Sequence, residues 1–237
     1  MPAPSEIVFE RPRRLSDLQP MTQRFTDVGL PAQLAQTWFA QVLRGGFALA
    51  AAGGSATFSA IADGVLRSLF PQHAPDRDPS EAVQHVLDGF LSLHVHPDVP
   101  VGVRVLAGRG LRLLTLTNGA TRVAETLLTG AGVHEQFETL LSVEAAGRRP
   151  PEAGPESYAY AARECGVPPA ELLLVAVHPW EIDGAARAGS QTVWVDRSGG
   201  TRYPPYRTTT ALTTADLTVA GVDDLARKAI GHAKAGT

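Results

Sequence analysis

Five polar residues of this chain combine side chains that carry protons with side chains that bind ligands: Glu10, Thr117, Asn118, His178 and Glu181. Each stands at or shortly after the end of an apolar run. Carboxylates and imidazoles are the groups that enzymes use most often to accept and donate protons. Thr117 and Asn118 add hydrogen-bonding groups. The chemistry that these residue types favour is proton transfer on a bound small molecule.

A parallel sheet would bring these positions together. After residue 97, short apolar runs alternate with helical patterns, which is typical of βαβ units. Ligands of such sheets bind beyond the carboxyl ends of the strands, so we expect the polar residues to share that edge. The expected strands are Ile7–Phe9, Leu111–Leu116, Leu140–Val143, Leu172–Val177, Thr192–Val195 and, as a short last strand, Thr218–Val222.

The stretch from Leu18 to about Leu93 has a different pattern. Its apolar residues recur at helical spacing, with glycine pairs and a proline-rich loop between the repeats, which predicts four helices and no strand. The sequence therefore predicts an α/β fold with a Rossmann-like parallel-sheet core and an inserted helical cap. We expect residues 1–16 and 94–237 to form the core, and residues 17–93 to form the cap.

Composition narrows the class of protein. The chain has 237 residues, of which 44% are hydrophobic and 19% charged, and its net charge is −3. That balance is typical of a globular protein and gives no basic surface for nucleic acid or membranes. The apolar run Phe47–Ala52 is too short to span a bilayer. Since Cys165 is the single cysteine and no apolar signal region opens the chain, we expect a cytoplasmic protein. A homodimer is an option for its oligomeric state.

Four segments resemble, in order and spacing, the four motifs of the haloacid dehalogenase superfamily. The most similar type is the 2-haloacid dehalogenase, which has a helical cap after its first strand. The resemblance covers the chain from Ile7 to about Tyr206 and implies the family's fold. Its strongest local matches are Leu116-Thr117-Asn118-Gly119, Pro155-Glu156-Ser157-Tyr158, Val175-Ala176-Val177-His178-Pro179-Trp180-Glu181 with Gly184-Ala185, and Gln191-Thr192-Val193-Trp194-Val195-Asp196-Arg197.

The first motif differs from the family at its acid. The resemblance implies an aspartate that attacks the substrate carbon and forms an ester, but Glu10 stands there, with one more methylene. A misplacement of about 1 Å can lower a rate about 10²-fold. Pro12 stands where the phosphatase branch has a second aspartate for Mg²⁺. We therefore expect neither efficient ester formation nor a metal site.

The other motifs differ as well. The family's third motif needs a lysine, but the only two lysines lie in the last ten residues. Arg149 is the nearest cation in the 147–155 loop, and since arginine keeps its proton it could serve only as an anchor. Glu181 replaces the aspartate of the fourth motif, and His178 replaces an asparagine before it. Phe39 stands where the dehalogenases carry an arginine.

These comparisons give the expected site. We expect Glu10, His178 and Glu181 to be catalytic, and no cofactor to be needed. Arg14 could anchor an anionic group of the ligand. Cys165 lacks a neighbouring base in the sequence and is interpreted as structural. The residues expected to bind the substrate are Arg14, Phe39, Thr117, Asn118, Arg149, Tyr158 and Trp180.

Three functions follow from the pattern. Because both altered positions are still acids and His178 is added between them, the first is general acid–base chemistry on a small organic molecule, namely isomerisation, cyclisation or elimination. The second is a pseudoenzyme that binds a small molecule or another protein. The third is a weak haloacid dehalogenase-like hydrolase that uses Glu10. The simplest alternative role for His178 is hydrogen bonding to the turn before a helix.

Overall fold

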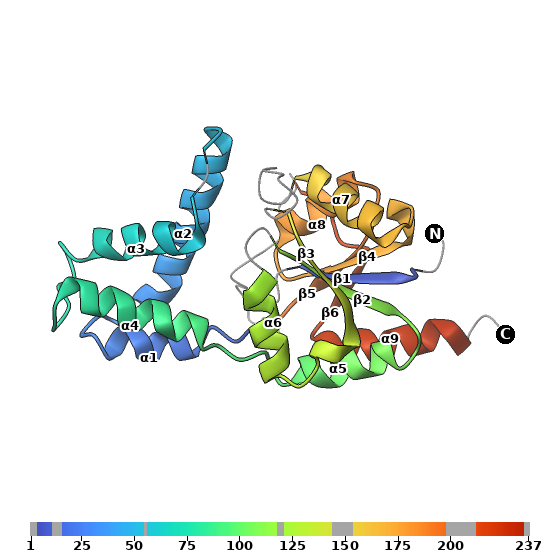
Figure 1. Ribbon diagram of the computed structural model, residues 1–237, viewed down its shortest axis with the longest axis horizontal. Helices are drawn as coiled ribbons and strands as arrows, with labels where there is room; N and C mark the ends of the chain where they lie inside the picture. Colours follow the sequence, from blue (N-terminus) through green and yellow to red (C-terminus); the bar gives the residue numbers. More distant parts are fainter. Residues whose placement is uncertain are drawn as a thin grey trace. The chain divides into compact units, whose positions relative to one another are not determined.

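Figure 1 shows the computed structural model of the chain, which describes residues 4–10, 16–54, 56–117, 121–143, 154–197 and 212–234. The chain divides into two compact units. Unit 1 comprises Met1–Leu15 with Val95–Thr237, and unit 2 comprises Ser16–His94. Each unit has its own hydrophobic core.

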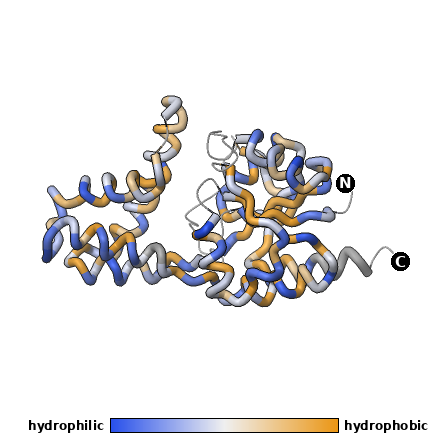
Figure 2. The backbone as a smooth tube through the Cα atoms, viewed as in Figure 1, coloured by the Kyte–Doolittle hydropathy of each residue, from blue (hydrophilic) through white to orange (hydrophobic). Residues whose placement is uncertain are grey.

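Unit 1 is built on a six-stranded sheet in the order β3-β2-β1-β4-β5-β6, in which all neighbouring strands are parallel. The apolar strands run through the middle of the unit in Figure 2. An all-parallel sheet is buried on both faces, which accounts for strands that are apolar almost throughout. The strands are β1 (Glu6–Glu10), β2 (Arg112–Thr117), β3 (Phe137–Ser142), β4 (Leu172–Ala176), β5 (Gln191–Val195) and β6 (Leu217–Val219).

Helices cover the two faces of this sheet (Figure 1). On one face, α5 (Asp98–Ala107), α6 (Thr121–Gly130) and α9 (Val222–Lys234) pack on a core that includes Phe9 and Val175. On the other face, α7 (Pro155–Cys165) and α8 (Pro179–Arg187) pack on a core that includes Val8 and Leu174. Short 3₁₀ turns at His134–Gln136 and Pro169–Glu171 precede β3 and β4. The α/β, parallel-sheet fold predicted from the sequence is thus confirmed.

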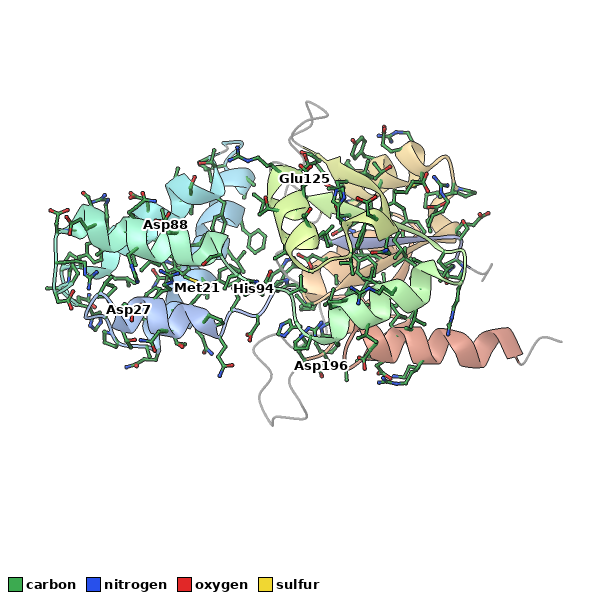
Figure 3. The ribbon with its side chains drawn as sticks, turned by 60° about the horizontal axis from the view of Figure 1, so that its bottom comes forward. Met21, Asp27, Asp88, His94, Glu125 and Asp196 are labelled. Carbon is green, nitrogen blue, oxygen red and sulfur yellow. The ribbon has the colours of Figure 1, made fainter. Side chains whose placement is uncertain are left out.

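Unit 2 consists of helices in its described residues: α1 (Pro20–Thr26), α2 (Leu34–Ala51), α3 (Phe58–Leu69) and α4 (Pro79–Leu91). They pack around Trp38, which is 1% exposed and donates its indole N–H to the carbonyl of Ala62 at 3.0 Å. Asp27, labelled in Figure 3, follows α1 and lies 3.1 Å from His85 of α4. Hydrogen bonds from Gln23 and His85 lower the pKa of Asp27.

One helix of unit 1 has no counterpart in the sequence analysis. The segment Asp98–Ala107 contains Pro100, Gly102 and three other valines beside Val99, and these residues have low helix propensity. Burial of one helix face against the sheet and α9 overrides this preference. Gly102 permits the contact, because a Cβ at this position would lie 2.4 Å from the backbone carbon of Val222. Propensity alone could not predict the helix, since its stabilisation comes from tertiary packing.

A charge cluster lies at the amino-terminal edge of the sheet, opposite the ligand edge. Arg112 bonds to the buried Glu6 and forms two hydrogen bonds to Glu138, at 2.6 and 2.7 Å. Burial raises the pKa of Glu6, although the Arg112 charge acts in the opposite direction. The same guanidinium reaches the carbonyl of Cys165 at 3.3 Å. This cluster joins β1, β2, β3 and α7.

Cys165 should be chemically inert in the folded protein. Its side chain is 6% exposed, and burial, followed by the charge of Glu6, raises the pKa of the thiol to about 11. Because only the thiolate reacts with alkylating reagents, we expect no modification by iodoacetamide at pH 8 over the time in which free cysteine reacts fully. In denaturant the same thiol should react at once. Rapid modification of the native chain, followed by mass spectrometry, would contradict this prediction.

Candidate functional site

The strand order defines where a ligand would bind in unit 1. From β1 the chain continues to β2 and β3 on one side, and then crosses to β4 on the other side. This reversal makes the carboxyl ends of β1 and β4 the topological switch point of the sheet, which is the usual ligand position in such folds. Glu10 is the last residue of β1, and His178 lies two residues beyond the end of β4. The two residues therefore flank the switch point.

Glu10 lies on the face of the sheet that α8 covers, and His178 stands at the start of that helix. Ile7 and Phe9 contribute to the core under α5 and α9, so the alternation along β1 directs Glu10, like Val8, to the face covered by α7 and α8. Phe9 pairs with Val175, and His178 stands three residues after this partner. Glu10 and His178 thus follow two adjacent strands at the same edge of the sheet.

His178 and Glu181 form a buried pair at the start of α8. His178 is the residue that caps the helix, and Glu181 lies in its first turn. The Nδ1 atom of His178 lies 3.4 Å from Oε2 of Glu181, and the side chains are 3% and 1% exposed. The N–H of Glu181 donates to the carbonyl of His178 at 3.2 Å. The carboxylate faces the Nδ1 edge of the imidazole, and we expect it to favour the tautomer that carries its proton on Nδ1, which leaves Nε2 as the proton acceptor.

Aromatic side chains complete the surroundings of this pair. Trp180 stacks on the imidazole of His178, with ring centroids 4.4 Å apart and an interplanar angle of 21°. Tyr158 on α7 is fully buried in the core layer that α7 and α8 share. Pro179 starts α8 directly after His178, which fixes the backbone where the helix begins. The imidazole is thus held by a ring on its face and a carboxylate at its edge.

The described residues place part of the predicted site in unit 1. Glu10, Thr117, Tyr158, His178, Trp180 and Glu181 all belong to unit 1. Phe39 belongs to unit 2, where it packs at the edge of the core around Trp38, with ring centroids 6.5 Å apart. Its role in substrate binding stays a prediction. Arg14, Asn118 and Arg149 lie outside the described residues.

Two residues at this edge were missed by the sequence analysis. Ser142 ends β3 and is the register partner of Thr117 at the end of β2, so the two hydroxyls stand side by side. Trp194 on β5 donates its indole N–H to the carbonyl of Val177 at 3.1 Å. A search for polar residues at strand ends could have found Ser142. The same search could not have found Trp194, because the indole nitrogen is the one polar atom of a mostly apolar side chain.

Asp183 connects α8 to the segment that precedes β6. Asp183 accepts hydrogen bonds from the N–H and the hydroxyl of Thr213, at 3.0 and 2.8 Å. These bonds lower the pKa of Asp183, with a smaller contribution from Arg187. Asp183 is therefore ionised at neutral pH and ties the segment before β6 to α8. Asp196, labelled in Figure 3, continues the sheet there, since its N–H donates to the carbonyl of Val219.

Among the residues that the structure describes, histidine, cysteine and carboxylate side chains do not gather in any group of three or more that could hold a metal ion. No helix in this described part of the chain is long and apolar enough to cross a membrane. The described part of the edge carries two acids, an imidazole, hydroxyls and aromatic rings.

The fold and this edge define an α/β protein with acid and base groups at the switch point of a parallel sheet. The model of the haloacid dehalogenase-like hydrolase family matches residues 32–189. That match covers more than half of the chain, which therefore belongs to the haloacid dehalogenase-like hydrolase family, as its motifs indicated.

Known relatives agree with this assignment. Haloacetate dehalogenase H-2 of Moraxella sp. (strain B) is 32% identical over 124 residues, which are 52% of this chain and 54% of that protein. The (S)-2-haloacid dehalogenase of Pseudomonas sp. (strain YL) is 31% identical over 112 residues, 47% of each chain. The matches thus span about half the length of these relatives.

A solved structure extends the likeness to the whole fold. The L-2-haloacid dehalogenase from Xanthobacter autotrophicus superposes with a TM-score of 0.81. The superposition covers 96% of this chain and 99% of the dehalogenase. The sequence identity is 24%. At that level the likeness shows the architecture, and the chemistry has to be argued from the side chains.

Proposed function

We propose that this chain is a haloacid dehalogenase-like enzyme that acts on a small organic molecule by general acid–base catalysis. The observation that carries the proposal is the buried His178–Glu181 pair, which follows β4, the strand next to the one that ends at Glu10. A buried acid and an imidazole facing one ligand position are the groups that a proton-transfer reaction needs.

In this proposal each group has a role. Nε2 of His178 accepts a proton from a C–H or O–H bond of the ligand. Glu181 orients the ring through Nδ1 and stabilises the imidazolium that forms. His178 then returns the proton to a second position, or Glu10 delivers one from the neighbouring strand. In an isomerisation or a cyclisation one proton leaves the ligand and one returns to it, whereas in an elimination the returned proton goes to the departing group, which leaves as H–X; none of these reactions is a net hydrolysis.

Dehalogenation is the alternative that family membership favours, since the relatives named above are dehalogenases. In that reaction Glu10 would attack the substrate carbon, form an ester and release halide. Glu10 supports this reading by its position at the end of β1 and by its burial, 4% exposed. Its longer side chain and the missing lysine of the third motif argue against an efficient reaction.

Two assays separate these functions. The first incubates the protein in D₂O with a panel of small 2-oxo and 3-oxo acids and follows loss of the C–H signals by proton NMR. Acid–base catalysis predicts protein-dependent exchange or conversion of at least one compound. Mass spectrometry of molecules that co-purify with the protein extends the panel to its natural ligand.

The second assay measures halide release from 2-chloropropionate and chloroacetate. We expect a rate far below the roughly 1–10³ s⁻¹ typical of enzymes, because Glu10 and the absent lysine disfavour the ester. Release within that range, abolished in Glu10→Gln, would replace our proposal by the hydrolase. If neither assay shows turnover and a bound small molecule is found, the non-catalytic binder is the correct reading.

A further inference from the structure

We infer that Trp194 is a positioning residue for His178, acting from a neighbouring strand through the peptide bond that precedes the histidine. The inference rests on the proposed function, because positioning matters only where His178 has a task. It concerns a residue that has no titratable group and that was not among the site residues predicted from the sequence.

The hydrogen bonds of the β4–α8 turn point to this role. The ladder between β4 and β5 ends at the pair Ala176 and Trp194. Val177 follows, between the end of the strand and the first turn of the helix. Its carbonyl accepts the indole N–H of Trp194 at 3.1 Å. The indole thus supplies a donor one residue past the last pair of the ladder.

The bond acts on His178 through the planar peptide group. The carbonyl of Val177 and the N–H of His178 belong to one rigid plane. Fixing the direction of the carbonyl therefore fixes the plane that holds the backbone nitrogen and the Cα atom of His178, from which its side chain departs. Trp180 on the ring face and Glu181 at Nδ1 can hold the imidazole only if it starts from this position.

The location of Trp194 fits such a support. Its side chain packs, half-buried, against the core layer under α7 and α8, and His178 stands at the start of α8. Trp194 is flanked in β5 by Val193 and Val195, both buried on the opposite face. The ring is therefore anchored in a sheet held by two neighbouring strands, β4 and β6. A catalytic residue at the start of a helix gains precision from such a rigid partner.

The test compares Trp194→Phe with the wild-type protein. Phenylalanine keeps an aromatic ring and removes the donor. The tautomer of the His178 ring is measured by ¹⁵N NMR of the histidine side chains. The signals of His178 are those that are absent from the spectrum of His178→Asn. We expect the wild-type ring to be protonated at Nδ1, and the Trp194→Phe ring to shift towards a mixture of both tautomers. Turnover of whichever compound the D₂O assay identifies should fall about 10-fold to 10²-fold.

Trp38→Phe is the matched control. It removes the same kind of bond, an indole N–H to a backbone carbonyl, from the core of unit 2. It should lower stability and leave the His178 ring signals unchanged. If Trp194→Phe folds and its His178 signals match those of the wild type, the inference is wrong. If His178→Asn leaves turnover intact, the proposed function fails, and the ring signals still decide whether Trp194 fixes His178.

A measurement on the wild-type protein tests the same inference even if Trp194→Phe does not fold. The indole N–H signal of Trp194 is assigned from the spectrum of any folded Trp194 variant or by selective labelling. This N–H should exchange with D₂O at least about 10-fold more slowly than the indole N–H of free tryptophan, because its hydrogen bond must open first. Exchange at the free rate would overturn the inference without any variant enzyme.

Discussion

Replacement of His178 by asparagine should lower the turnover number by about 10²–10⁴-fold, the usual contribution of a general acid or base. Asparagine can still hydrogen-bond to the ligand and fits the space of the imidazole, but it cannot accept the proton. KM should change much less, because the lost interaction belongs to the transition state. The measurement is the exchange or conversion rate of the compound that the D₂O assay identifies, followed over substrate concentration.

A second histidine offers a matched control. His134 also pairs with a following glutamate, since its Nδ1 lies 3.6 Å from Oε1 of Glu135, but its side chain is 36% exposed. It stands just before the start of β3, at the edge of the sheet opposite Glu10 and His178. His134→Asn should leave turnover within about twofold of wild type, in line with the small effect of exposed pairs. Equal rates for wild type and His178→Asn, with both folded by circular dichroism, would remove His178 from the mechanism.

Much of the architecture could be predicted from the sequence, for a definite reason. Strands buried on both faces must be nearly continuous apolar runs, so Leu172–Val177 could be recognised without a structure. The boundaries were less accurate, because Glu6 and Glu10 are polar and the apolar pattern excluded them from β1. Both are buried, and Glu6 pairs with Arg112, which lies far away in the sequence.

The candidate site could be predicted in position but not in geometry. Parallel topology places strand ends at one edge, which was enough to select Glu10, Thr117 and His178. Which side chains meet depends on the register and on the strand order. The contact of His178 with Glu181 follows from their spacing of three residues on a helix, whereas the bond from Trp194 to Val177 depends on the pairing of β4 with β5.

Replacement of Asp98 by alanine should destabilise unit 1 by about 3 kcal/mol, because it breaks a mostly buried ion pair and leaves its partner uncompensated. Asp98 begins α5 and binds Arg197 through two hydrogen bonds, at 2.6 and 3.0 Å. It also accepts the N–H of Val222 at 2.7 Å, at the start of α9. One carboxylate thus joins α5, α9 and the end of β5, and its side chain is 19% exposed.

The pH dependence of this effect has a definite sign. Burial acts to raise the pKa of Asp98, but the hydrogen bonds from Arg197 and Val222 outweigh it and lower the pKa below 3.8. A carboxyl group with a lowered pKa in the folded state stabilises the protein above its unfolded-state pKa, and this contribution is lost as the pH falls through the folded-state value. The difference between wild type and Asp98→Ala should therefore be full at pH 7 and shrink below about pH 3.8.

Urea unfolding at a series of pH values measures this difference, and the melting temperature at pH 7 should fall by roughly 6–12 °C. Arg187→Ala is the control in the same unit, since Arg187 is 66% exposed and lies 3.7 Å from Asp183. It should change the free energy of unfolding by less than about 1 kcal/mol. If Asp98→Ala matches this control, or if its effect is the same at acid and neutral pH, then packing of α5 on α9, rather than the carboxylate, holds these elements together.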